Sequence, residues 1–280
     1  MRMSKSLALL LAVCLCIAGC GSSADVSEKQ QALKQEGMEL QSAGDYSGAI
    51  AKYEEALQLS DMKVGKEEID LAYYKASAQY RSGDIAGAID TYSAVIALKK
   101  DINGYLGRGM LYVAAKDAEK AEADLNKALQ ETDDPLIKGI IYNVVNETEK
   151  AKECFEDAKR AGNVEASFYL AGIYEEAGDE NYAMILLEEY IASGKAGAEG
   201  YLSVGRHYME DEAYTDALKT LQAGIALGES GVLKSLLQEE IACYEKMGNF
   251  ASAREKAEDY LDKYPEDALI QNEYEFLKSR

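Results

Sequence analysis

The chain has 280 residues, of which 50 are Asp or Glu and 30 are Lys or Arg, so its formal net charge at pH 7 is −20. Such an acidic surface repels the phosphates of nucleic acids and of anionic lipid headgroups, and no basic cluster in the sequence offsets it. The composition therefore excludes DNA and RNA as ligands and indicates that electrostatics do not hold the protein at a bilayer.

The N-terminus has the features of an export signal. Two basic residues precede an apolar run over residues 7–18, which is much shorter than the roughly 20 residues needed to cross a hydrocarbon core. The segment Ile17-Ala18-Gly19-Cys20 resembles the lipobox of bacterial lipoproteins, which implies cleavage before Cys20 and attachment of a diacylglycerol to its thiol. We therefore expect residues 1–19 to be absent from the mature protein. The alternative is an ordinary secretory signal that happens to contain cysteines.

The remainder is predicted to be almost entirely helical. Pro135 and Pro265 are the only prolines, and Ala, Leu, Glu, Lys and Gln fill long stretches. The helical pattern breaks where a glycine is followed by Asp or Asn, as a left-handed C-terminal cap followed by an N-cap residue would do. These pairs are Gly44-Asp45, Gly83-Asp84, Gly178-Asp179 and Gly248-Asn249.

An internal repeat follows these turns. An alanine lies five residues after each turn glycine, and further alanines extend the series at intervals of 30 to 39 residues. Six of the seven positions twelve residues upstream hold Gly or Ala, and most positions four residues downstream hold a large apolar residue. The alanines are Ala49, Ala88, Ala121, Ala151, Ala183, Ala217 and Ala253.

This pattern resembles the tetratricopeptide repeat, a helix-turn-helix unit of about 34 residues with small residues where its two helices cross. The resemblance covers residues 30–266 in seven units and is clearest over Tyr201–Tyr208 with Tyr214–Ala217. It implies an all-α, right-handed α-solenoid of about seven such repeats. Residues 267–280 are predicted to form a helix that caps the last unit, and residues 20–29 are left as the lipidated cysteine and a short linker.

Units three and four depart from the pattern. Ala128 and Gly139 are only 11 residues apart, so the first helix of unit four is predicted to lose about one turn and the superhelix to kink there. Lys116-Asp117 and Asn146-Glu147 replace the glycine turn in these two units, and Ser60–Lys66 is predicted to be a loop.

The resemblance implies that the first helix of each unit lines a concave surface. Counting along the units predicts an apolar, tyrosine-rich trough in the N-terminal half and an acidic surface in the C-terminal half, which suit a peptide with apolar anchors and a basic end. The alternative is that Tyr and Met pack between repeats and that Glu only solvates the surface. The candidate partner-binding residues are Lys34, Met38, Tyr73, Tyr80, Met110, Asn143, Phe168, Glu175, Arg206 and Glu210. The same counting places Val113, Glu165, Glu176 and Glu199 on this surface.

Catalytic and metal chemistry find little support in the sequence. No GxSxG, GxxxxGK or HExxH motif occurs, and His207 is the sole histidine, expected as a packed or surface residue rather than a catalytic one. Cys154 and Cys243 are the only cysteines after Cys20 and are expected in the core. We therefore expect no enzymatic activity, no cofactor and no metal.

The sequence thus favours a membrane-anchored adaptor on the extracytoplasmic face of a bacterial cell membrane, or of the outer membrane in a cell with two membranes, that binds a protein or peptide through its concave face. The alternative is a receptor lipoprotein that captures a soluble extracellular peptide or glycan fragment. The adaptor and the receptor hypotheses differ in the size of the ligand and in whether a dedicated partner protein co-purifies. The dicarboxylate clamp of chaperone-binding family members is not expected, because its first Asn position holds Met38, Ser77 and Met110 in the first three units.

Overall fold

The computed structural model describes residues 23–60, 64–228 and 230–280. In this part of the chain every regular element is a helix, and consecutive helices form seven pairs followed by one single helix. The pairs are α2 (Ser23–Ser42) with α3 (Tyr46–Gln58), α4 (Lys66–Arg81) with α5 (Ile85–Leu98), α6 (Ile102–Ala114) with α7 (Ala118–Glu131), α8 (Pro135–Val144) with α9 (Thr148–Arg160), α10 (Glu165–Glu176) with α11 (Glu180–Ala192), α12 (Ala198–Glu210) with α13 (Tyr214–Ala226), and α14 (Ser230–Lys246) with α15 (Phe250–Lys263). The last helix is α16 (Ala268–Leu277). The predicted all-α solenoid of helix pairs is confirmed.

The turn within four of the described pairs follows the glycine and N-cap chemistry predicted from the sequence. Gly44 adopts a left-handed conformation with φ of 81°, and the side chain of Asp45 accepts a hydrogen bond of 2.8 Å from the backbone N–H of Gly48, which caps α3. Units three and four reach the same turn without glycine, because Lys116 and Asn146 take φ values of 59°. The glycine is therefore favourable at this position but not required by the fold.

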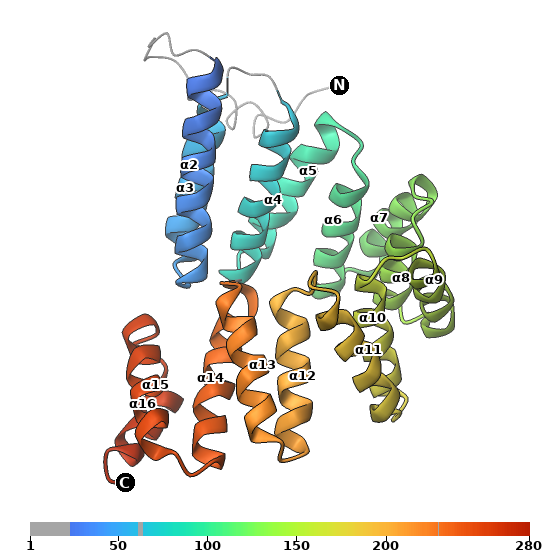
Figure 1. The fold of residues 1–280 in the computed structure, drawn as a ribbon. Helices are drawn as coiled ribbons and strands as arrows, with labels where there is room; N and C mark the ends of the chain where they lie inside the picture. The colour runs from blue at the N-terminus through green and yellow to red at the C-terminus, as the bar shows by residue number, and fades with distance from the viewer. Residues whose placement is uncertain (1–22, 61–63, 229) are drawn as a thin grey trace.

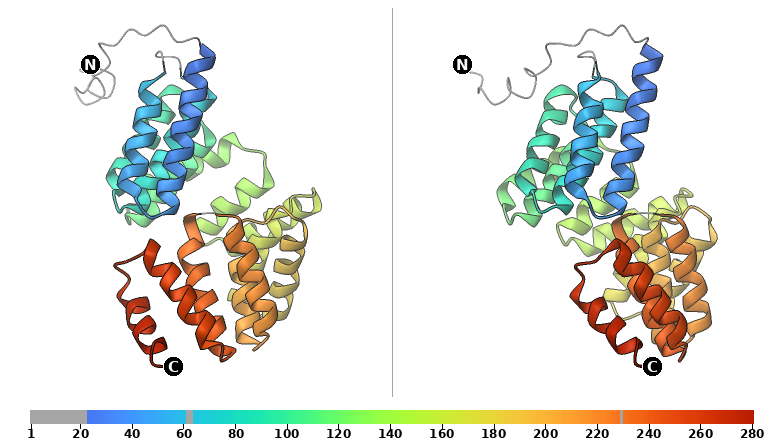
Figure 2. Two further views of the ribbon diagram at one scale, coloured as in Figure 1. Left: turned by 60° about the vertical axis from the view of Figure 1, so that its left-hand side comes forward. Right: turned by 90° about the vertical axis from the view of Figure 1, so that its left-hand side faces the viewer.

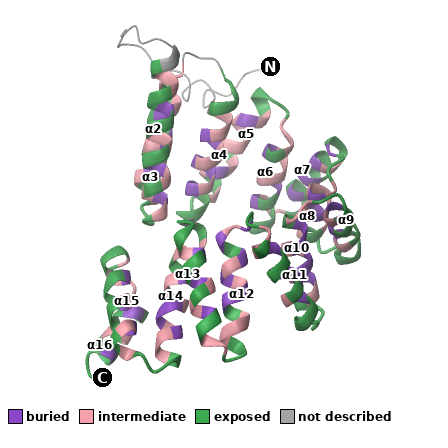
Figure 3. Ribbon diagram, in the orientation of Figure 1, coloured by how far each residue is buried: buried purple, intermediate pink, exposed green. Residues whose placement is uncertain are grey.

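Small residues occur where the two helices of a unit cross. A Cβ atom at Gly37 would lie 2.5 Å from the ring of Tyr53, so only hydrogen fits there. Gly139 has the same relation to the ring of Phe155, and Ala151 is completely buried. The small and large residues of the repeat therefore fill one another's space, and buried residues recur along the whole array instead of gathering in one centre (Figure 3).

Unit four is shorter than its neighbours, as predicted. Helix α8 has 10 residues against 12 in α10, and it begins at Pro135, after Asp134 accepts a hydrogen bond of 2.8 Å from the N–H of Leu136. Among the described residues, contacts between α7 and α8 are sparser than between any other two consecutive helices. The chain changes direction through α7–α9 (Figure 1), which agrees with the predicted kink.

The array therefore folds back on itself in two tiers. Helices α2–α6 form an upper tier and α10–α16 a lower tier, and the views in Figures 1 and 2 agree on this arrangement. The tiers touch where the C-terminal ends of α2 and α4 meet helices of the lower tier. Nη1 of Arg81 donates a hydrogen bond of 3.3 Å to the carbonyl of Gly231, and the hydroxyl of Tyr264 donates one of 3.4 Å to the carbonyl of Ser42.

Helix α16 packs on unit seven, where Ile270 and Leu277 are buried beside Tyr260. Leu269 and Phe276 also belong to the apolar pattern of this predicted capping helix, but they do not pack on unit seven: their side chains are 70% and 46% exposed. A capping helix has no further unit to cover its second face, so part of an apolar pattern remains in solvent.

The N-terminal part of the array also differs from expectation. Helix α2 begins at Ser23, so most of the segment 20–29 assigned to a linker is helical. No glycine or proline interrupts residues 23–30, and Asp25 lies in the first turn, where a carboxylate complements the helix dipole. The predicted signal and Cys20 lie outside the described residues. Among those described, no helix has the length and apolarity needed to span a bilayer.

Candidate functional site

The first helices of the upper tier carry exposed apolar side chains. Tyr80 on α4 is 50% exposed, and Met110 and Val113 on α6 are 45% and 43% exposed. We call these three residues the apolar strip. Exposed large apolar side chains on neighbouring helices are typical of interaction surfaces, so the strip suits the predicted role of Tyr80 and Met110, which stays a prediction.

Two other candidates of the upper tier contact their own neighbours. Nζ of Lys34 lies 2.9 Å from Oδ2 of Asp70 and 4.5 Å from the ring centre of Tyr74. The hydroxyl of Tyr73 donates a hydrogen bond of 2.6 Å to Asp101. Burial, with this hydrogen bond as the second cause, raises the pKa of Tyr73 well above its usual range. For Tyr73 the structure therefore favours the alternative in which tyrosine packs between repeats.

A cavity of about 500 Å³ lies between the two tiers. We call it the inter-tier cavity. Its upper part comes from α2 and α4, and its lower part from α10–α12, α14 and the turn before α14. It brings together Met38 and Phe168, which are 130 residues apart, and it includes Glu165 and Glu199. Its size lies in the range of about 300–1,000 Å³ that small-molecule and cofactor pockets occupy.

One wall of the inter-tier cavity is aromatic. The ring of Phe168 lies 5.8 Å from that of Tyr169 and 5.6 Å from that of Tyr190, and Tyr169 stacks on Phe155 at 4.9 Å. Burial, followed by the charges of Glu165 and Glu199, raises the pKa of Tyr169 to about 12. The two carboxylates therefore lie close enough to Tyr169 to disfavour its ionised form.

A smaller cleft of about 150 Å³ continues from this wall between α10 and α12. We call it the α10–α12 cleft. It shares Phe168 and Tyr169 with the inter-tier cavity and adds Asn143, Glu175 and Glu176. Oε1 of Glu175 lies 2.9 Å from Nε2 of His207, which joins units five and six. Three predicted site residues, Asn143, Phe168 and Glu175, thus line one cleft.

The last two candidates lie apart from both hollows. Nε of Arg206 lies 2.8 Å from Oε1 of Glu239 on α14, so Arg206 connects units six and seven. Glu210 is exposed at the end of α12 and lines neither the inter-tier cavity nor the α10–α12 cleft. The structure therefore separates these two residues from the aromatic wall.

The described residues contain no group of three or more His, Cys, Asp or Glu side chains placed to hold a metal ion. Cys243 is buried, as predicted, and its Sγ lies 3.2 Å from the carbonyl of Tyr214. Cys154 is only partly buried, because α9 places it at the edge of its unit. Burial raises the pKa of both thiols, which disfavours the reactive thiolate.

Sequence reasoning missed several residues that line the inter-tier cavity. Tyr74 and Arg81 come from the upper tier, and Tyr190 and Val232 come from the lower tier. The side chain of Tyr74 lies one residue, and therefore about 100° around the helix, from the predicted Tyr73. No local signal in the sequence marks Arg81 or Val232, because they become neighbours only when the array folds back.

Comparison with known families and structures agrees with the helix pairs described above. Family models of the tetratricopeptide repeat match residues 34–102 and residues 242–267. No curated protein sequence matches the chain.

Several solved structures resemble it. The type IV pilus biogenesis factor PilW is 16% identical, with a TM-score of 0.51 over 74% of this chain and 99% of its own. A chain of the APC/C hetero-tetramer Cut9–Hcn1 is 11% identical, with a TM-score of 0.53 over 91% of this chain and 56% of its own. A tetratricopeptide repeat protein from Parabacteroides merdae is 15% identical, with a TM-score of 0.49 over 90% of this chain and 99% of its own. At these identities the likeness concerns the fold alone.

Proposed function

We propose that this chain, which belongs to the tetratricopeptide repeat family, binds a protein or peptide partner through the concave surface of its array while anchored to the outer side of a bacterial membrane. The observation that carries the binding role is the apolar strip of Tyr80, Met110 and Val113, whose large side chains are exposed on first helices of the array. Exposed apolar and aromatic side chains with nearby polar groups are the usual composition of a binding surface.

The anchoring role is supported by the sequence Ile17-Ala18-Gly19-Cys20 at the end of an export signal. A diacylglycerol supplies two acyl chains, which give stable membrane attachment where one chain gives only marginal binding. Helix α2 begins three residues after Cys20, so the acylated cysteine would hold the array close to the bilayer.

Replacing the acylated thiol tests the anchor. We expect Cys20→Ser to abolish labelling by a clickable fatty acid and to release the chain from salt-washed membranes or leave it unprocessed. Cys154→Ser is the matched control, since it removes a thiol from the array, and should keep both properties. Equal labelling and membrane retention of the Cys20→Ser variant would disprove the lipoprotein assignment.

The binding role is tested by crosslinking in intact cells, followed by identification of the captured partner and affinity measurements with purified components. We expect Tyr80→Ala to weaken partner binding by about 2 kcal/mol, because interface tyrosines often contribute that much. Tyr182→Ala is the control: Tyr182 is 40% exposed but lies on α11, a second helix. Equal loss in both variants, or in neither, would exclude the apolar strip as the contact surface.

A second candidate function is capture of a soluble peptide or glycan fragment for delivery elsewhere. The observation that favours it is the inter-tier cavity, whose volume of about 500 Å³ fits a small ligand. Native mass spectrometry of the chain purified from its own cells distinguishes the two. A bound mass of a few hundred daltons without a protein partner would favour the receptor.

A further inference from the structure

Four carboxylates of the lower tier line the two hollows, which share Phe168 and Tyr169. Glu165 and Glu199 line the inter-tier cavity, and Glu175 and Glu176 line the α10–α12 cleft. Within the described residues, Glu165, Glu199 and Glu176 have no ion-pair partner, whereas Glu175 contacts His207. The surface thus presents negative charge that the rest of the structure does not neutralise.

Aromatic rings connect the two pairs of carboxylates. Phe168 and Tyr169 line both hollows, and Tyr190 extends their wall inside the inter-tier cavity. A cationic side chain beside a carboxylate and over an aromatic face gains from both contacts. The lining cation of the inter-tier cavity, Arg81, is directed to the carbonyl of Gly231 at the contact between the tiers, so it does not pair with either glutamate.

The spacing of the carboxylates sets the spacing of the ligand's charges. Glu165 and Glu175 are ten residues apart on α10, which corresponds to about 15 Å along the helix axis. An extended peptide advances about 3.3 Å per residue, so about four or five residues span this distance.

We infer that the lower tier binds an extended peptide segment with two basic side chains four or five residues apart, one between Glu165 and Glu199 and the other at Glu175 and Glu176. The residues between them lie over Phe168 and Tyr169. This inference rests on the proposed peptide-binding function and specifies the chemistry of its partner.

The carboxylates also have an ordinary structural role, which the test must separate from binding. Glu165 and Glu199 lie in the first turns of α10 and α12, where negative charge complements the helix dipole. That role changes the stability of the array but does not depend on the charge of a ligand. A change made in the peptide alone therefore distinguishes the two roles.

The experiment begins with selection of displayed random peptides of 12 residues on the full chain purified in detergent. We expect the selected peptides to carry two Arg or Lys residues separated by four or five positions. Each basic residue is then replaced by a neutral analogue of similar shape, Arg by citrulline and Lys by norleucine. Each replacement should weaken binding about tenfold, as expected for a lost charged and cation–π contact.

The protein variant Glu165→Gln with Glu199→Gln should weaken binding of the original peptide by a similar factor. In this variant, neutralising the basic residue of the peptide that binds between Glu165 and Glu199 should have no further effect, because its carboxylates are already gone. Neutralising the basic residue that binds at Glu175 and Glu176 should still weaken binding. Glu122→Gln with Glu149→Gln is the matched control, since both residues are exposed on the second helices α7 and α9. Thermal unfolding of every variant verifies that the array remains folded.

The outcomes separate the inference from the proposed function. Selected peptides without paired basic residues, or peptides insensitive to both sets of replacements, would overturn the inference and leave peptide binding standing. Equal weakening by the control variant would also overturn it, because general surface charge would then explain the effect. Failure to select any binding peptide would also overturn the inference, whereas the proposed binding of a protein partner is rejected only if crosslinking and the Tyr80→Ala variant fail as well.

Discussion

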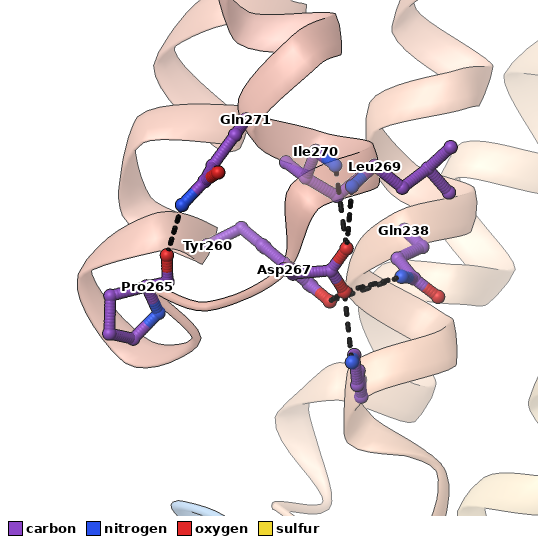
Figure 4. Close-up of polar contacts among 8 residues, drawn as sticks. Gln238, Tyr260, Pro265, Asp267, Leu269, Ile270 and Gln271 are labelled. Atoms are coloured by element: carbon purple, nitrogen blue, oxygen red, sulfur yellow. Dashed lines mark hydrogen bonds and ion pairs between the residues drawn. The ribbon is translucent and has the colours of Figure 1, made fainter.

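The attachment of the terminal helix depends on one carboxylate, that of Asp267. Its Oδ2 accepts hydrogen bonds from the hydroxyl of Tyr260 at 2.6 Å and from Nε2 of Gln238 at 3.3 Å, and it lies 2.9 Å from Nζ of Lys234. Its Oδ1 accepts hydrogen bonds from the first backbone N–H groups of α16 (Figure 4). One side chain therefore joins α14, α15 and α16.

The electrostatic part of this attachment can be worked out from the titration of Asp267. Lys234, followed by Tyr260, lowers the pKa of Asp267 from 3.8 to about 2, and its side chain is 10% exposed. Since one pKa unit corresponds to about 1.4 kcal/mol, the charged form stabilises the folded state by about 2 kcal/mol. Because the folded pKa is depressed, this stabilisation is present above pH 3.8 and is lost as the pH falls towards 2.

The variant Asp267→Asn removes the charge but keeps a side chain that caps helices well. We expect hydrogen exchange in α16 to become about 30-fold faster at pH 7, the factor that corresponds to about 2 kcal/mol in a locally opening segment. Asp45→Asn is the control, because Asp45 also caps a helix but forms no ion pair within the described residues. Unchanged exchange at pH 7, or a difference that persists undiminished at pH 2, would refute this reasoning.

Three further predictions concern pH, backbone strain and contact between the tiers. Burial, followed by the charge of Glu273, raises the pKa of Glu245 to about 7. The folded protein therefore loses stability as the pH rises from 4.5 through 7, where the folded state must give up this proton. Glu245→Gln should raise the free energy of unfolding by about 1 kcal/mol at pH 8, a value reduced for solvent screening, and should leave it unchanged at pH 4.5. Glu212 has a φ of 59°, so Glu212→Gly should stabilise unit six by about 1 kcal/mol in chemical denaturation, and a loss of stability would contradict this. Arg81→Ala removes the hydrogen bond to Gly231 and should increase the radius of gyration in X-ray scattering, whereas an unchanged value would show that this contact does not hold the tiers together.

The features that could be predicted from the sequence are local. Gly44-Asp45 specifies both a left-handed turn and an N-cap within two residues, so the boundary between α2 and α3 follows from the chemistry of those residues alone. The small Gly37 opposite the large Tyr53 fixes how the two helices cross in the same way. The shortened α8 could be predicted because the number of residues available limits the length of a helix.

The candidate site was predicted less completely. To predict where a side chain points, the rotation of its helix about the helix axis must be known to better than the roughly 100° that separates consecutive residues. Tyr73 and Tyr74 are adjacent on α4, yet Tyr73 packs against the next unit and Tyr74 lines the inter-tier cavity. Repeat counting predicted both Tyr73 and Tyr80, which are seven residues apart and therefore lie on the same face of α4. Tyr80 is exposed, whereas Tyr73 is covered by Tyr92 and Asp101, so what covers one face of a helix changes along its length.

The fold-back of the array has a different origin from its local features. In a solenoid each unit contacts mainly its neighbours, and the small rotations between units add along the chain. The contact between Arg81 and Gly231 therefore depends on the geometry of every unit between them, including the sparse contact of α7 with α8. The inter-tier cavity takes its walls from both tiers, so a substitution between α7 and α8 would change its dimensions without touching a lining residue. Ligand binding and the bend of the array are for this reason expected to be coupled: a ligand that contacts both tiers favours the bend in which they lie together.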